Sequence, residues 1–107
     1  KIIHCDEFQT QGADKIAERI KKRVGNNPLY LSIDIDVLDP AFAPGTGTPE
    51  IAGMTSREMV NVLRSLSGLN LISADVVEVS PAYDHAEVTS LAAATIVYEL
   101  TNLFAKK

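Results

Sequence analysis

The sequence is poor in several features, and each shortage excludes a class of protein. Cys5 is the only cysteine, so no internal disulfide is possible, and a reducing compartment is the default expectation. No stretch of the sequence resembles a membrane span, and no signal peptide is visible. We therefore expect no membrane partner.

Positive charge is also scarce and scattered. Lys and Arg total 10 against 14 Asp and Glu, which gives a formal net charge of -4. The densest basic run, Arg19–Arg23, would spread around a helix, so we interpret it as a solvated face and expect no nucleic-acid partner. A length of 107 residues with 46% apolar composition suits one soluble domain with a modest core.

The chain begins at Lys1 and not at a methionine. We therefore expect it to be part of a longer polypeptide, whose targeting signals would lie upstream of this sequence. The expected location is the cytoplasm or the mitochondrion, and secretion is left open.

Apolar spacing predicts helices that alternate with strands. The expected elements are helices over Gly12–Val24, Thr55–Ser67 and Glu87–Phe104, and strands over Leu29–Ile33 and Leu69–Val79. This order predicts a layered α/β fold with parallel strands and right-handed crossovers, whose ligand site lies beyond the carboxyl ends of the strands. Two strands alone leave both sheet edges open, so we expect further strands upstream or in a partner chain.

Local signals at two places refine this prediction. Thr55 followed by Glu58 three residues later predicts a capping box at a helix start. The short apolar piece Lys1–Cys5 is interpreted as a strand remnant, with His4 at a strand end or packed.

The most informative stretch is Leu29–Glu50, LYLSIDIDVLDPAFAPGTGTPE, because carboxylates follow its apolar run. Side chains alternate along a strand, so Asp34 and Asp36 are expected to leave on the same face. Such a pair is costly unless a cation or hydrogen-bond donors lie between the two carboxylates, and a hard divalent metal is the simplest cation. Glu78 ends the next strand, so a second acidic strand end is expected at the same edge of the sheet.

A long loop without periodicity follows the two carboxylates. Three prolines at positions 40, 44 and 49 predict a fixed shape, and Gly45–Thr48 offers backbone donors, hydroxyls and close approach to a ligand. A loop of this length is usually functional or disordered. The alternative is a rigid crossover that only covers the sheet.

Three motifs compete for the carboxylates. An EF-hand fails because Leu38 occupies the third ligand position, and the required glycine and distal glutamate are absent. An aspartyl-phosphate phosphatase would use Asp34 as nucleophile and Asp36 as acid/base. A two-metal hydrolase would use a carboxylate to bridge two ions that activate water.

Two segments carry a resemblance to a known family. The stretch SIDIDVLDPAFAPGTGTPE at residues 32–50 resembles the signature of the ureohydrolases, the family of arginase and agmatinase. DVVEVSPAYD at residues 75–84 resembles the family's later substrate-site segment, and both tails look more like agmatinase than arginase. The resemblance implies a three-layer αβα sandwich on a parallel sheet, with residues 1–107 as the C-terminal part of one ureohydrolase domain.

The same resemblance implies roles for single residues. Asp34 matches a carboxylate that bridges two Mn²⁺ ions, and Asp36 matches a ligand of one of them. Glu78 matches the acid that pairs with the substrate guanidinium, and Thr48 matches a loop threonine near the substrate. Asp39 matches a third aspartate, to which we assign a structural role in holding the loop. The implied reaction is Mn²⁺-dependent hydrolysis of agmatine to putrescine and urea, with arginine or other guanidino and formimino acids as alternatives.

The chain also departs from the family pattern. Two further metal-binding segments of the family, one of them rich in His and Asp, do not occur here, and neither His4 nor His85 lies in such a motif. We interpret His85 as a surface residue, with contact at the rim of the site as the alternative. We expect a small guanidino molecule as the partner, homo-oligomers of the whole enzyme, and no activity from this piece alone. The contrasting hypothesis is a non-catalytic remnant that folds or associates without metal.

Overall fold

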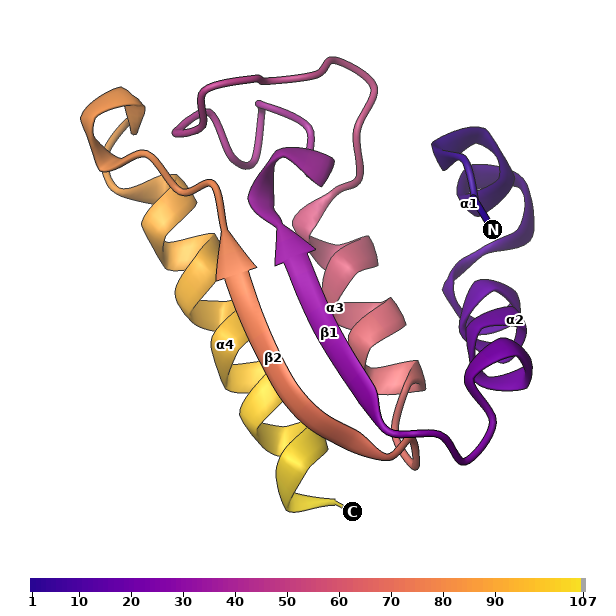
Figure 1. The fold of residues 1–107 in the computed structure, drawn as a ribbon. Helices are drawn as coiled ribbons and strands as arrows, with labels where there is room; N and C mark the ends of the chain where they lie inside the picture. The colour runs from indigo at the N-terminus through magenta and orange to yellow at the C-terminus, as the bar shows by residue number, and fades with distance from the viewer. Residues whose placement is uncertain (107) are drawn as a thin grey trace.

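Helices and strands alternate along most of the chain in the computed structural model, which describes residues 1–106 (Figure 1). The elements are α1 (Cys5–Gln11), α2 (Ala13–Val24), β1 (Leu29–Asp34), the 3-10 turn η1 (Ile35–Val37), α3 (Ser56–Ser65), β2 (Leu71–Val77), the 3-10 turn η2 (Pro81–Tyr83) and α4 (Val88–Ala105). The three expected helices and the two strands expected over Leu29–Ile33 and Leu69–Val79 are therefore present, with ends displaced by a few residues at most.

The two strands pair side by side in parallel. The register runs from Leu29 opposite Leu71 to Asp34 opposite Val77, with an irregularity after Leu29. Their carboxyl ends therefore meet at one edge of the sheet, and the predicted parallel α/β arrangement is confirmed. Each strand has one unpaired edge within residues 1–106.

Helices cover one face of this small sheet. α4 packs against β2 and α3, and α2 packs against α3. Ile33 and Leu71 are buried on that side, whereas Tyr30 on the opposite face is 55% exposed. Of the three expected layers, residues 1–106 thus form the sheet and one helical layer (Figure 1).

The α3 helix begins with the predicted capping box. The Glu58 N–H donates to Thr55 Oγ1 at 3.1 Å, and the Thr55 N–H donates to Glu58 Oε2 at 2.8 Å. Met59, Val62 and Leu63 then face the core, as their helical spacing predicts. The cap and the buried stripe together position the end of the loop that precedes α3.

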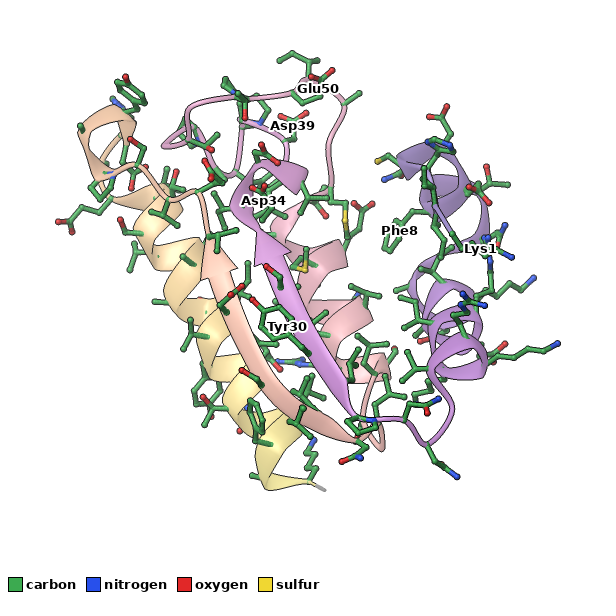
Figure 2. The ribbon with its side chains drawn as sticks, viewed as in Figure 1. Lys1, Phe8, Tyr30, Asp34, Asp39 and Glu50 are labelled. Carbon is green, nitrogen blue, oxygen red and sulfur yellow. The ribbon has the colours of Figure 1, made fainter. Side chains whose placement is uncertain are left out.

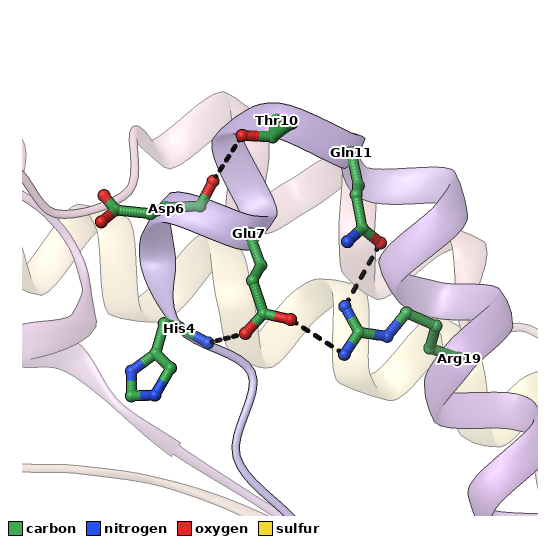
Figure 3. A network of polar contacts seen from close by, with 6 residues as sticks. All are labelled: His4, Asp6, Glu7, Thr10, Gln11 and Arg19. Carbon is green, nitrogen blue, oxygen red and sulfur yellow. Dashed lines mark hydrogen bonds and ion pairs between the residues drawn. The ribbon is translucent and has the colours of Figure 1, made fainter.

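The first helix was not anticipated, and the prediction of a strand remnant over Lys1–Cys5 is wrong. No strand is present there; Cys5 opens α1, and His4 is an exposed residue whose N–H donates to Glu7 Oε2 at 2.9 Å. Arg19 of α2 bonds Glu7 at 3.1 Å and Gln11 at 3.2 Å, which joins the two helices (Figure 3). The reading of His4 as a packed or strand-end histidine is therefore also wrong.

The last helix, α4, is long and apolar enough to cross a membrane by length and composition alone, with a mean hydropathy of 1.3 over 18 residues. This differs from the expectation that no stretch resembles a span. A single such helix is weak evidence, because core helices pass the same test. In this fold Glu99, buried in the middle of α4, is held by Arg64 at 2.7 Å, which lowers the pKa of Glu99.

Candidate active site

Asp34 and Asp36 lie together at the carboxyl end of β1, although for a different reason than strand alternation. The strand ends at Asp34, and Ile35–Val37 form a 3-10 turn, so Asp36 is not a strand residue. The turn brings the Asp36 N–H to Asp34 Oδ1 at 3.1 Å, which caps the turn and holds the Asp34 carboxylate. Figure 2 shows Asp34 at this end of the strand. The expected same-face arrangement along a strand was therefore wrong, but the pair is still formed.

Thr48 joins this pair from the far part of the loop. Its hydroxyl donates to Asp36 Oδ2 at 2.8 Å. Within residues 1–106, neither Asp34 Oδ2 nor Asp36 Oδ1 accepts a hydrogen bond from another residue. Each carboxylate thus has one oxygen fixed by the protein and one oxygen available to a ligand.

Asp39 ties the two ends of the loop to each other. Its Oδ1 accepts from the Ala41 N–H at 2.8 Å, and its Oδ2 accepts from the Ala52 N–H at 3.0 Å. Its own N–H donates to the Met54 carbonyl at 2.8 Å. These contacts give the loop a fixed entry and exit beside Asp34, with Glu50 at its outer side (Figure 2).

Gly53 permits that closure because there is no room for a side chain. A Cβ there would lie 2.6 Å from the Asp39 nitrogen and 2.8 Å from the Val37 carbonyl oxygen. Both are backbone atoms, so the strand-like pairing of Leu38 with Met54 would have to open to accept one. Gly47 offers the contrast, because a Cβ there meets nothing within 4 Å.

We expect Gly53→Ala to lower the free energy of unfolding by about 1–3 kcal/mol, the usual cost of overpacking a tight site. Gly47→Ala is the matched control in the same loop and should change it by less than about 0.5 kcal/mol. Urea unfolding followed by circular dichroism measures both. Equal effects of the two substitutions would contradict the close approach at Gly53.

Glu78 follows β2 directly and has an unusual backbone. Its φ is 68°, in the left-handed region that non-glycine residues seldom occupy. Val77 is opposite Asp34 in the register, so Glu78 leaves the sheet immediately beyond that pair. The Glu78 side chain is exposed and makes no hydrogen bond or ion pair within residues 1–106. The backbone alone therefore places this carboxylate at the same edge of the sheet.

An open cavity of about 790 Å³ adjoins the aspartate pair. Its polar lining includes His4, Asp34, Asp36, Thr48 and Glu50, and most of its other lining residues are apolar. Glu78 is not part of the lining. No Lys or Arg occurs between positions 24 and 56, where four carboxylates fall, so the loop around the pair has only negative charge. These surroundings favour a cation.

The two histidines differ in their relation to the site. His4 lines the cavity through its position at the start of α1, which the sequence reading did not foresee. His85 is exposed, and its backbone N–H donates to Asp84 Oδ1 at 2.9 Å. Among residues 1–106, no group of three or more His, Cys, Asp or Glu side chains is arranged to hold a metal ion.

Asp84 is a residue to which sequence reasoning gave no role. Its Oδ1 accepts from the Thr89 N–H at 2.9 Å and its Oδ2 from the Ser90 N–H at 3.0 Å, at the start of α4. Asp84 lies three residues before the N-cap position, Glu87, so the usual signal of an aspartate directly before a helix did not identify it. Burial by itself would raise the pKa of Asp84, but the hydrogen bonds from Thr89, Ser90 and His85 outweigh it and hold the pKa far below its usual value.

The family model described as the arginase family matches residues 1–102. The chain belongs to the arginase family. It is 48% identical to an agmatinase of Enterobacter sp. (strain 638), over 99% of this chain and 35% of that protein. It is 50% identical to a guanidinopropionase of Pseudomonas aeruginosa, over 99% of this chain and 33% of that protein.

A solved structure agrees with the fold. The proclavaminate amidino hydrolase of Streptomyces clavuligerus superimposes with a TM-score of 0.97 at 46% identity, over 99% of this chain and 35% of that one. The arginase-like α/β fold implied by the sequence is thus confirmed. This family member spans about a quarter to a third of the length of the curated relatives it matches.

The residues present fit the manganese ions that the sequence resemblance implies, as part of a larger ligand set. Asp34 and Asp36 each offer a hard carboxylate oxygen, the donor type that suits Mn²⁺. Two carboxylates are too few for a pair of ions.

Proposed function

We propose that this chain is the C-terminal part of a ureohydrolase domain that hydrolyses a guanidino group with the aid of Mn²⁺. The observation that carries the proposal is the Asp34–Asp36 pair, which presents two available oxygens at the carboxyl ends of parallel strands. The names of the relatives point to guanidino substrates.

Agmatine is the substrate that the charges favour. Agmatine carries a guanidinium and an ammonium group. Arginine carries a carboxylate in addition, and guanidinopropionate carries a carboxylate instead of the ammonium group. Four acids and no base fall between positions 24 and 56, so a carboxylate on the substrate would be repelled there. The products would be putrescine and urea.

The guanidinium group is a planar cation and a poor electrophile, so its position must be fixed. Glu78 is proposed to pair with it through charge-assisted hydrogen bonds, which hold the plane toward Asp34 and Asp36. Thr48 holds the Asp36 carboxylate in one orientation through the 2.8 Å hydrogen bond. When bound, Mn²⁺ supplies Lewis acidity, which lowers the pKa of water so that it is a nucleophile near neutral pH.

The reaction then balances as a simple hydrolysis. Water adds to the guanidinium carbon, and the bond from that carbon to the alkyl nitrogen breaks. The alkyl nitrogen leaves as an amine that takes up a proton, and the carbon leaves as urea. Glu78 would hold the remaining nitrogens in place throughout.

Two features support a larger domain around this chain. The cavity beside Asp34 is also lined by the apolar residues Ile16, Ile20 and Leu31, and within residues 1–106 β1 and β2 each have an unpaired edge. We expect the rest of the polypeptide to supply the further metal ligands and to pair with these edges. Association of whole domains into a homo-oligomer is part of the same proposal.

The test uses the full-length polypeptide that contains this chain, loaded with Mn²⁺. We expect urea release that stops on chelation with EDTA and returns with Mn²⁺, with kcat/KM highest for agmatine among agmatine, arginine and guanidinopropionate. Residues 1–107 alone are expected to bind Mn²⁺ weakly and to release no urea.

Three outcomes would contradict parts of this proposal. Absence of urea release from every guanidino compound would overturn the reaction. Release that is insensitive to EDTA would overturn the metal requirement. Robust release by residues 1–107 alone would overturn the need for ligands from elsewhere.

A further inference from the structure

We propose that Thr89 is a positioning residue, which holds the loop of the aspartate pair against the segment that carries Glu78. This inference rests on the proposed function. Thr89 is fully buried at the start of α4 and lies in neither acidic strand end. It acts through the backbone of Gly45 and does not contact the expected position of the substrate.

Gly45 is bonded from both sides. Its N–H donates to Thr89 Oγ1 at 2.8 Å, in a buried hydrogen bond between residues 44 positions apart. Its carbonyl accepts from the Ser80 N–H at 2.7 Å. Ser80 is two residues beyond Glu78, and Gly45 is three residues before Thr48. Gly45 therefore joins the two segments of the site, namely the loop that carries Thr48 and the segment after β2 that carries Glu78.

Asp84 fixes Thr89 in turn. It accepts the backbone N–H of Thr89 at 2.9 Å and both the N–H and the hydroxyl of Ser90 at 3.0 and 3.2 Å. The lowered pKa of Asp84 means that this carboxylate is ionised, and so a full acceptor, throughout the working pH range of an enzyme. Thr89 is thus held on a rigid helix start.

There is no room for a side chain at Gly45. A Cβ on Gly45 would lie 2.9 Å from Asp84 Cβ and 3.0 Å from Asp84 Cα. The loop backbone therefore packs directly against Asp84. The hydroxyl of Thr89 accepts the hydrogen bond of the buried Gly45 N–H.

This arrangement matters for Glu78 because no side-chain contact within residues 1–106 holds that carboxylate. Its left-handed backbone is fixed by Val77 on one side, which pairs with Asp34, and by Ser80 on the other, which bonds Gly45. A guanidinium between Glu78 and the aspartate pair needs a fixed distance between the segment that carries Glu78 and the loop that follows the pair. Displacement by about 1 Å in such a site costs about 100-fold in rate.

The test compares Thr89→Val with Thr89→Ser in the Mn²⁺-loaded full-length polypeptide. Valine keeps the volume but leaves the Gly45 N–H without an acceptor, whereas serine keeps the hydroxyl. Thr95→Val is the matched control on the same helix, because the exposed Thr95 hydroxyl bonds only the Leu91 carbonyl at 3.0 Å.

We expect Thr89→Val to lower kcat/KM for agmatine about 10- to 100-fold, because the segment that carries Glu78 would be displaced from the aspartate pair. The Mn²⁺ content and the dissociation constant for Mn²⁺ should stay within about twofold of those of the unchanged enzyme. Thr89→Ser and Thr95→Val should remain within about threefold of the unchanged enzyme. If the valine variant does not fold, Thr89→Cys replaces it, since a thiol is a weak acceptor and should give a smaller loss in the same direction.

Unchanged kcat/KM in Thr89→Val, or in Thr89→Cys where that variant is used, would overturn the positioning role, and so would a loss shared equally by Thr95→Val. A parallel loss of Mn²⁺ and activity would also overturn it, because it would indicate a general collapse of the site. Failure of the proposed function looks different: the unchanged enzyme itself would then release no urea.

Discussion

Replacement of Asp34 by Asn in the full-length polypeptide is expected to lower Mn²⁺-dependent urea release by about 1000-fold or more, equivalent to about 4 kcal/mol in the activation barrier. The amide has the shape of the carboxylate but no negative charge, so it is a poor ligand for a hard cation. Its oxygen still accepts from the Asp36 N–H, the contact that the carboxylate makes at 3.1 Å. The fold around the turn should therefore survive.

Asp14→Asn is the matched control. Asp14 is an exposed carboxylate on α2 that bonds the Ser65 hydroxyl at 2.7 Å and does not line the site cavity. Its replacement should change activity by less than about twofold. Metal content by mass spectrometry, together with urea release, distinguishes the two variants. An Asp34→Asn enzyme with full Mn²⁺ content and unchanged turnover would refute its role as a metal ligand.

The second large effect is expected at Glu78. Glu78→Gln should raise the activation barrier for agmatine hydrolysis, measured as kcat/KM, by about 2–5 kcal/mol, the usual cost of removing one partner of a desolvated charge pair. Glutamine keeps the length of the side chain but cannot neutralise a guanidinium. Mn²⁺ content should be unchanged, because Glu78 is proposed to contact the substrate and not the ions.

Glu87→Gln supplies the control for this experiment. Glu87 is likewise an exposed glutamate on left-handed backbone, with φ 60° against 68° for Glu78. The two variants thus share the chemical change and the type of backbone, and differ in position. Similar losses in both variants would show that the effect at Glu78 is not specific to the substrate.

Sequence patterns located most elements because the signals are local. The predicted helix Gly12–Val24 is observed as Ala13–Val24, and the capping box at Thr55 and Glu58 forms as expected. Helical spacing and caps depend on neighbours within about four residues, so they can be read from the sequence directly. α1 was not predicted because Phe8 is its only buried residue, so the helix has no apolar stripe that a sequence pattern would show.

The site was predicted in part for the same reason. The carboxylates at 34, 36 and 78 were visible as acids that follow apolar strands. The 3-10 turn that moves Asp36 out of the strand was not predicted, although its side-chain cap from Asp34 lies only two residues away and is as local as the cap at Thr55. The roles that the resemblance implies for Asp34, Asp36, Thr48 and Glu78 stay predictions.

By itself, the sequence determined the alternation of helices and strands, the acidic strand ends and the membership of the arginase family. Only the tertiary structure decided how the loop closes through Asp39 and Gly53, and how Gly45 meets Thr89. These contacts join residues from 13 to 44 positions apart, and in each hydrogen bond a backbone N–H donates to a distant side-chain oxygen. Every residue except proline carries such an N–H, so the sequence does not reveal which of them a given side chain will meet.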